Sequence, residues 1–293
     1  MKRLLQIVGL IIVGLIILLI VVIGFVFAQS NAKFNKIWEV DVASLDIVID
    51  DDTLAEGERL FVTRGCGDCH SENGAGTLFI DDPALGQIPA PNLTSGEGGV
   101  GQFYTTEDYI RAIQHGIRPD GTSLMIMPSE DWQQMRAEEL SPLLAYLLNL
   151  EPVDNVLPDR QPGPIGRALV VFGELPLAAE LIDHDTAGLI EVEYGASVEF
   201  GEYIARNCSG CHGADFSGSV LPPENIETPN ITSHEDGIGT WSLEEFIPAM
   251  QTGVTPDGRQ LSDAMPWRGF GQMTPEELEG LYLYLQTTEP VAE

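Results

Sequence analysis

The sequence predicts an all-α protein in which an N-terminal transmembrane helix is followed by two tandem helical domains. Three observations predict this fold class. The chain begins with one long apolar run, a short cysteine and histidine motif occurs twice, and helix-start signals recur at matching distances after each motif. A length of 293 residues also suits about two domains.

The first predicted element is an apolar helix over residues 4–28. These 25 residues carry no charge and would form a helix of about 37 Å, enough to cross a hydrocarbon core of ~30 Å with some tilt. The alternative is an unusually long signal peptide cleaved near Ala28. A signal peptide usually has an apolar run of only about 7–15 residues. We therefore expect an uncleaved membrane anchor.

The rest of the chain divides by composition and by its internal repeat. We expect a tether over residues 29–50, a first domain over residues 51–152 and a second domain over residues 196–290. Between the domains, residues 153–195 form a linker. A loose segment of this length is rare in a compact protein, so the linker should pack on the domains.

The repeated motif reads Cys66-Gly67-Asp68-Cys69-His70 and Cys208-Ser209-Gly210-Cys211-His212. In this pattern the two thiols can add to the vinyl groups of a haem, and the next imidazole can bind its iron. A zinc site would need four ligands at one place, and a redox thiol pair would not need the histidine. The motifs therefore predict two covalently attached haem c groups, with His70 and His212 as iron ligands.

Further matching segments follow each motif and indicate an internal duplication. In each copy a Pro-Asn-Leu/Ile-Thr loop precedes a helix with a capping-box start and a glycine end, then a Pro-Asp-Gly turn, a Met-Pro pair and a final amphipathic helix with a tyrosine. Pro142 should delay or kink the first of these final helices. The matching positions are Pro91 and Pro229, Thr105 and Ser242, Gly116 and Gly253, Met127 and Met265, and Tyr146 and Tyr284.

The matched methionines are the candidates for the sixth iron ligand. Met127 and Met265 stand in the same register, each before a proline, and a thioether is soft enough to bind haem iron. Filling of core space is the alternative role, and Met125 competes with Met127. His115 and His234 have no counterpart in the other copy, so we expect neither to be a ligand.

Two further roles are expected near the motifs. The second ring nitrogen of each ligand histidine needs a partner, and backbone carbonyls of the loops holding Pro91 and Pro229 could supply it. Arg64 and Arg206, just before the motifs, could pair with haem propionates or lie on a solvated surface. His184 in the linker is expected on the surface.

The charge distribution excludes one class of partner. All three lysines lie in the first 36 residues, and from Ile37 onward ten arginines stand against 45 acidic residues, a formal charge of −35. Nucleic-acid phosphates would be repelled by such a surface. The acidic surface keeps the protein soluble, and it could also steer a basic redox partner.

These motifs resemble those of class I cytochrome c domains, and their tandem arrangement is similar to membrane-anchored dihaem cytochromes c of bacteria. Cytochrome subunits of alcohol and gluconate dehydrogenases contain similar modules, although typically three. The resemblance covers about residues 53–150 and 196–288. It implies two small haem domains in which the first and last helices cross. It also implies that haem is attached after export, so that both domains lie on the periplasmic or extracellular side of the cytoplasmic membrane.

The expected function is electron transfer by two haems with His/Met ligation, without catalysis by the chain itself. Redox proteins are the expected partners, with a dehydrogenase, a quinol-oxidising complex or a terminal oxidase as candidates. One alternative function is the cytochrome subunit of a membrane-bound dehydrogenase complex. A second alternative is a dihaem peroxidase-like enzyme, which would need one iron with an exchangeable site.

Overall fold

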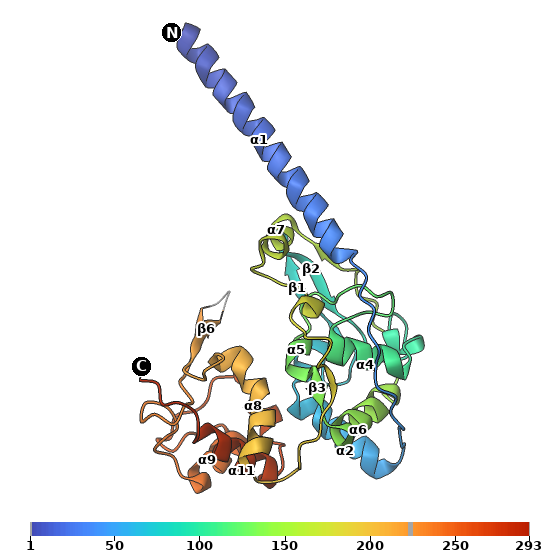
Figure 1. The fold of residues 1–293 in the computed structure, drawn as a ribbon, viewed down its shortest axis with the longest axis vertical. Helices are drawn as coiled ribbons and strands as arrows, with labels where there is room; N and C mark the ends of the chain where they lie inside the picture. Colours follow the sequence, from blue (N-terminus) through green and yellow to red (C-terminus); the bar gives the residue numbers. More distant parts are fainter. Residues whose placement is uncertain (1, 222–224, 293) are drawn as a thin grey trace. The chain divides into compact units, whose positions relative to one another are not determined.

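The computed structural model describes residues 2–221 and 225–292, which form mainly helices joined by loops (Figure 1). The helices are α1 (Lys2–Phe34), α2 (Asp51–Thr63), α3 (Cys66–His70), α4 (Thr106–His115), α5 (Ser129–Trp132), α6 (Ala137–Leu148), α7 (Pro164–Phe172), α8 (Val198–His212), α9 (Leu243–Thr252), α10 (Trp267–Phe270) and α11 (Pro275–Leu285), with short 3-10 turns η1 (Val100–Gln102) and η2 (Ala178–Glu180).

Short strands also occur, so the expectation of an all-α chain holds for the main elements only. They are β1 (Thr77–Asp82), β2 (Gly86–Ala90), β3 (Gln134–Met135), β4 (Gln161–Pro162), β5 (Gly188–Leu189), β6 (Ser219–Leu221) and β7 (Ile226–Thr228). The antiparallel pairs β1–β2 and β6–β7 follow the two haem motifs. Strands of three to six residues are too short for a clear period-2 pattern, so sequence reasoning took these segments for loops.

The chain divides into two compact units that do not follow the linear order of the sequence. The first unit comprises Met1–Ser44, Asn73–Gln134 and Leu150–Gly188, and the second comprises Leu45–Glu72, Met135–Asn149 and Leu189–Glu293. The second unit therefore contains helices from both copies of the repeat.

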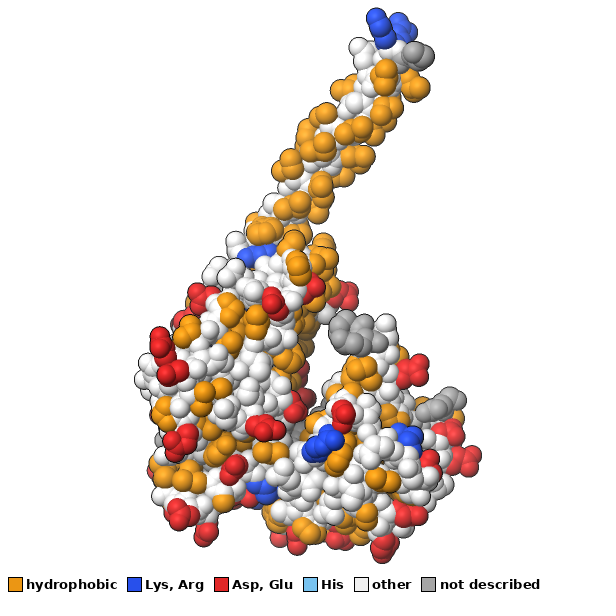
Figure 2. Space-filling view, turned by 180° about the vertical axis from the view of Figure 1, so that it is seen from behind, with side chains coloured by type: hydrophobic (Ala, Val, Ile, Leu, Met, Phe, Trp, Pro, Cys, Tyr) orange, Lys and Arg blue, Asp and Glu red, His pale blue; other side chains and the backbone are white. Residues whose placement is uncertain are grey.

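In the first unit, α1 is long and apolar enough to cross a membrane. Its side chains are exposed from Leu4 to Phe25, and Figure 2 shows a rod covered by apolar side chains with basic groups at its tip. The helix continues past the predicted anchor to Phe34, so its last turns replace the first part of the predicted tether. Phe34 joins a core cluster with Ile88 and Val170.

In the second unit, the first and last helices of each sequence copy cross at a glycine. Gly57 of α2 lies so close to α6 that an added Cβ would overlap the carbonyl oxygen of Pro142 and approach the Cβ of Tyr146. Gly201 of α8 meets the carbonyl oxygen of Gly280 and the Cβ of Tyr284 in the same way. The crossing that the family resemblance implies is therefore present in both copies. Because glycine has no side chain, the two helix axes can approach closely at each crossing, and no room for a Cβ remains there.

The helix boundaries expected from the repeat are also present. Thr105 caps α4, since its Oγ1 accepts from the Asp108 N–H at 3.2 Å and the Asp108 carboxylate accepts from the Thr105 N–H at 3.0 Å. Helices α4 and α9 end at Gly116 and Gly253, with φ of 64° and 71°. Such left-handed conformations favour glycine. Pro142 lies inside α6, and the helix runs through it.

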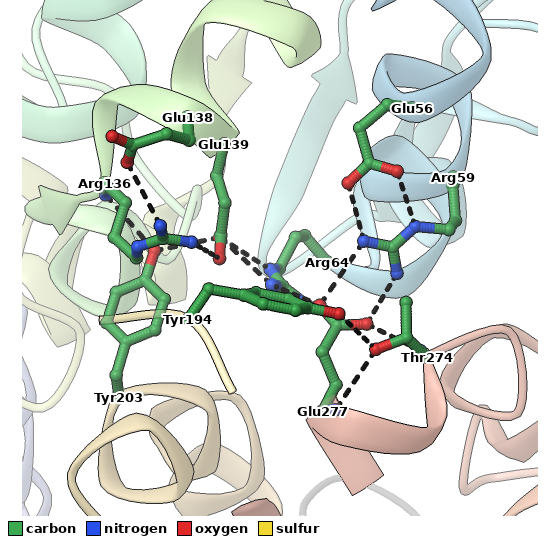
Figure 3. A network of polar contacts seen from close by, with 10 residues as sticks. All are labelled: Glu56, Arg59, Arg64, Arg136, Glu138, Glu139, Tyr194, Tyr203, Thr274 and Glu277. Carbon is green, nitrogen blue, oxygen red and sulfur yellow. Dashed lines mark hydrogen bonds and ion pairs between the residues drawn. The ribbon is translucent and has the colours of Figure 1, made fainter. Parts of the chain in front are cut away.

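Buried ion pairs connect the helices of the second unit (Figure 3). Arg64, which follows α2, has a side chain only 2% exposed. Its Nη2 donates to Glu139 of α6 at 3.0 Å and to Glu277 of α11 at 3.1 Å. The solvated role considered for Arg64 is therefore wrong, because its guanidinium is enclosed between carboxylates from both sequence copies.

Further contacts surround this guanidinium. Tyr203 of α8 donates its hydroxyl to Glu139 at 2.9 Å, and Arg59 of α2 donates to Glu277 at 2.6 Å. Glu277 also caps α11 by accepting from the Thr274 N–H at 2.8 Å. Burial alone would raise the pKa of Glu277, but the charges of Arg64 and Arg59 outweigh it and lower that pKa below its ordinary value of 4.5.

We predict that Gly201→Ala destabilises the second unit. The new methyl group would meet the α11 backbone, and overpacking of this kind costs about 1–3 kcal/mol. Thermal unfolding followed by circular dichroism measures the loss. Gly210→Ala is the matched control, because it lies in the same helix with open space around its Cβ and the first copy holds Asp68 at that position. Equal melting temperatures for the two variants would contradict the close crossing.

We predict that Arg64→Met costs about 3–5 kcal/mol of stability at neutral pH, because it leaves two buried carboxylates without their shared cation. The control is Arg268→Met, whose ion pair with Asp263 is exposed and should contribute less than about 1 kcal/mol. Denaturant unfolding measures both. If Arg64→Met costs no more than Arg268→Met, the buried ion pairs do not support the unit.

The cost of Arg64→Met should also depend on pH. Because the folded-state pKa of Glu277 is lowered, its contribution in the wild type is fully present above about pH 4.5 and is lost as the pH falls through the folded value. Protonation also removes the uncompensated charge in the variant. The stability difference between the two proteins should therefore shrink below about pH 4.5. A difference that stays constant from pH 7 down to about pH 2 would contradict this explanation.

Candidate functional site

The second haem motif forms the last turn of α8. Ser197 starts this helix by accepting from the Phe200 N–H at 3.1 Å, and the helix ends at His212. Cys208 and Cys211 are three residues apart, so their side chains leave the same side of the helix. Both side chains are partly exposed, whereas His212 is buried. The local fold thus presents two thiols next to one enclosed imidazole.

The orientation of His212 is set by a backbone carbonyl. Its Nδ1 lies 2.8 Å from the carbonyl oxygen of Pro229, which can only accept a hydrogen bond. Nδ1 therefore carries the proton, and the lone pair is on Nε2. Burial lowers the pKa of His212 despite the opposing effect of the Pro229 bond, so the ring is neutral at pH 7. The carbonyl partner expected for this histidine is confirmed.

The repeated Pro-Asn-Leu/Ile-Thr loop is held by its asparagine in both copies. Asn230 Nδ2 donates to the Val291 carbonyl at 2.6 Å while its Oδ1 accepts from the Thr232 N–H at 2.8 Å. Asn92 makes the corresponding bonds to Val153 at 2.7 Å and to Thr94 at 2.9 Å. In each copy, the asparagine ties the loop to the segment that follows the last helix. In the second copy this loop carries the carbonyl that orients His212.

Met265 lies in a turn beside the hydrophobic core of the second sequence copy. It is partly buried and packs on a cluster that contains Phe246, Met250 and Leu281. Two residues later, Trp267 has a buried Nε1 without a hydrogen-bond partner among the described residues. A neutral imidazole with Nε2 available, a thioether in apolar surroundings and an unpaired indole donor all fit a haem, which is apolar with a polar edge.

The first motif has a different local structure. Cys66, Cys69 and His70 form the separate short helix α3, which Gly65 introduces with a φ of 71°. In the second copy one helix runs through the motif without this break. The cysteines and the histidine of the first motif are partly exposed. These three residues belong to the second unit, whereas Met127 belongs to the first unit.

Met127 and Met265 share a backbone geometry. The N–H two residues later returns to each methionine carbonyl at 2.8 Å, from Ser129 in the first copy and from Trp267 in the second. Each turn then leads into a one-turn helix, α5 or α10. The rival Met125 is instead buried in the core cluster with Phe34.

His115 and His234, the histidines that could rival the methionines as iron ligands, each contact another side chain. The His115 Nδ1 lies 3.1 Å from the His184 Nδ1, and burial, with smaller effects of His184 and Arg111, lowers the pKa of His115 to about 4. His184 is thus partly buried, and not a surface residue as expected. His234 pairs with Asp236 at 3.2 Å.

Arg206 and Arg64 differ although both precede a motif by two residues. The Arg206 guanidinium lies 5.6 Å from the ring centroid of Tyr203 and is partly exposed, whereas that of Arg64 is buried between glutamates. Sequence reasoning missed Glu139, Glu277 and Tyr203 as partners of Arg64. The available signal was the acidic residue at the capping position of α11, but helix capping explains that residue equally well.

Comparison with known proteins agrees with the motifs. A family model described as cytochrome c matches residues 54–151 and 200–289. The fructose dehydrogenase cytochrome subunit of Gluconobacter japonicus is 29% identical over 235 residues, covering 71% of this chain and 46% of that protein. The cytochrome c subunit of the quinone alcohol dehydrogenase of Komagataeibacter europaeus is 26% identical over 284 residues, covering 83% of this chain and 58% of that protein.

A third relative has a length closer to that of this chain. A diheme cytochrome c-type protein of Cereibacter sphaeroides is 23% identical over 261 residues, covering 79% of this chain and 84% of that protein. By contrast, the chain spans about half the length of the two dehydrogenase subunits. The two ranges matched by the family model cover more than half of the chain, and each contains one haem motif. The chain therefore belongs to the cytochrome c family.

Proposed function

We propose that the chain carries electrons on two covalently bound haem c groups, one for each motif. Cys66 and Cys69 would hold the first group and Cys208 and Cys211 the second. When bound, each haem supplies an iron that stores and releases one electron. The observation that carries the proposal is the repeated pairing of a cysteine and histidine motif with a Met-Pro turn of the same backbone geometry.

The ligands proposed are His70 with Met127 and His212 with Met265. For the second set, the bond from His212 to the Pro229 carbonyl holds the ring in one tautomer and one orientation. The apolar cluster around Met265 limits the access of water, and Met/His ligation raises the reduction potential of a haem relative to ligation by two histidines. In the first copy, the burial of Met125 in another core cluster favours Met127.

We further propose that α1 anchors the chain in the bacterial cytoplasmic membrane, with both haems on the periplasmic or extracellular side. Haem attachment after export supports this orientation, and the length of α1 supports a single span. An anchor restricts diffusion of the carrier to the membrane surface. The formal charge of −35 beyond residue 36 would favour encounter with a redox partner whose contact surface is basic.

A second candidate function is that of a cytochrome subunit in a dehydrogenase complex. The names of the fructose and alcohol dehydrogenase relatives favour it. The diheme relative, which matches a greater share of its own length, favours an independent carrier. Affinity purification from solubilised membranes separates the two, because a stoichiometric flavin or quinone-dependent catalytic subunit would accompany the chain only in the second case. A quinol-oxidising complex or a terminal oxidase as the partner would be found in the same experiment.

We predict that Met265→Leu opens one haem to external ligands. The absorption band of Met-to-iron charge transfer should lose about half of its intensity, and one reduced haem should bind carbon monoxide. The reduction potential of that haem should decrease, by less than the ~0.8 V range that axial ligands span. Met273→Leu is the control, because Met273 is buried in the same core cluster outside the Met-Pro turn. An unchanged charge-transfer band in Met265→Leu would show that Met265 is not a ligand.

We predict the same outcome for Met127→Leu in the other haem, and no change in ligation for Met125→Leu. The latter is a nearly volume-conserving change inside a core, so its cost should be below about 1.5 kcal/mol. Titration of each reduced variant with carbon monoxide measures the number of open irons. Carbon monoxide binding by Met125→Leu but not by Met127→Leu would reverse the assignment. Binding by the wild type would favour the peroxidase-like alternative.

A further inference from the structure

The linker helix α7 packs on the end of α1. Val26, Ser30 and Phe34 are the buried residues of α1, and their spacing of four places them along one face of the helix. Arg167 of α7 donates to Ser30 Oγ at 2.9 Å and to Asn31 Oδ1 at 2.8 Å. Figure 1 shows α7 beside the end of α1 within the first unit. Helix α7 therefore covers about the last two turns of α1.

This contact occurs where the apolar run of α1 ends. A hydrocarbon core of ~30 Å takes about 20 helical residues, so a span that begins near Leu4 would leave the hydrocarbon close to Gly24. The side chains are exposed up to Phe25, and burial against the protein begins at Val26. Anchored in this way, the protein would hold α7 at the level of the membrane interface.

Helix α7 also exposes apolar side chains of its own. Ile165 is 51% exposed and Phe172 is 66% exposed. The charged residue of the helix, Arg167, does not interrupt this exposed surface, because its guanidinium reaches α1 and lies 4.6 Å from the ring centroid of Phe27. An apolar helix surface in this position suits the boundary between lipid headgroups and acyl chains.

The local charge points to lipid as the occupant. Residues 160–173 contain two arginines and no acidic residue, although residues 37–293 carry a formal charge of −35. Anionic lipids at a membrane surface repel acidic side chains that lie next to them. Helix α7 itself thus presents no carboxylate to the membrane, although Asp159 and Glu174 flank this segment.

We propose that α7 is a second membrane contact, which lies on the lipid interface with Ile165 and Phe172 directed into it. Together with the anchor, this contact would limit the tilt of the first unit relative to the membrane. The linker between the two sequence copies thereby has a role in docking, in addition to connecting them. This inference rests on the proposal that α1 spans the membrane.

Spin labels on single cysteines in the full-length holoprotein test the proposal. The protein is placed in nanodiscs that contain anionic lipid, and the accessibility of each label to dissolved oxygen and to a water-soluble nickel chelate is measured. Phe172→Cys carries the test label. Phe103→Cys is the matched control, because Phe103 is 67% exposed and shortly precedes α4, which Figure 1 draws farther from the apolar part of α1. Leu15→Cys reports on the anchor.

The expected result is a ratio of oxygen to nickel accessibility several-fold higher at Phe172 than at Phe103, with the highest ratio at Leu15. Equal ratios at Phe172 and Phe103, with a high ratio at Leu15, would overturn the docking of α7 and leave the anchor intact. A low ratio at Leu15 would overturn the anchor and the docking together. Uptake of label by the wild type would contradict haem attachment, since all four native cysteines lie in the haem motifs.

Discussion

The buried guanidinium of Arg64 is the interaction on which the second unit depends. Two carboxylates that approach each other inside a protein repel strongly, and in this unit Glu139 and Glu277 share the cation of Arg64. Arg136 and Arg59 give each of them a second cationic partner. The residues involved come from α2, α6, α8 and α11, which are the first and last helices of both sequence copies. Arg64 also stands two residues before Cys66, so the ion pairs hold the segment that enters the first haem motif.

Close helix crossings complement this electrostatic constraint. At Gly57 and at Gly201 the partner helix approaches so closely that a methyl group does not fit. The same device recurs in the two copies, and so does the asparagine that ties the loop after each motif to the segment beyond the last helix. Duplication has therefore preserved local geometry. The copies differ at the motif itself, where α8 runs through and α2 and α3 are separated by Gly65.

Orientation of a ligand depends on small contacts of this kind. His212 is a suitable iron ligand because the carbonyl oxygen of Pro229 accepts a hydrogen bond from its Nδ1–H and burial keeps the ring neutral. The carbonyl of Pro229 is in turn held by the bonds of Asn230. In the first unit, Arg167 joins the linker helix α7 to α1 by donating to Ser30, while Ile165 and Phe172 of α7 stay exposed.

The sequence alone determined the features that depend on local order. A Cys-x-x-Cys-His motif requires only five adjacent residues, and an apolar helix is recognised by the length of its apolar run. Capping boxes and glycine ends act within one helical turn. The haem motifs, α1 and the ends of α4 could therefore be predicted. The carbonyl partner of His212 could also be predicted, because the repeat marked its loop. Pairings between distant residues were beyond such reasoning. By its sequence pattern, Arg64 could contact haem propionates or solvent. Only the packing of four helices encloses its side chain between Glu139 and Glu277. The short strands and the contact of α7 with α1 were decided in the same way, since burial and strand pairing are properties of the folded chain.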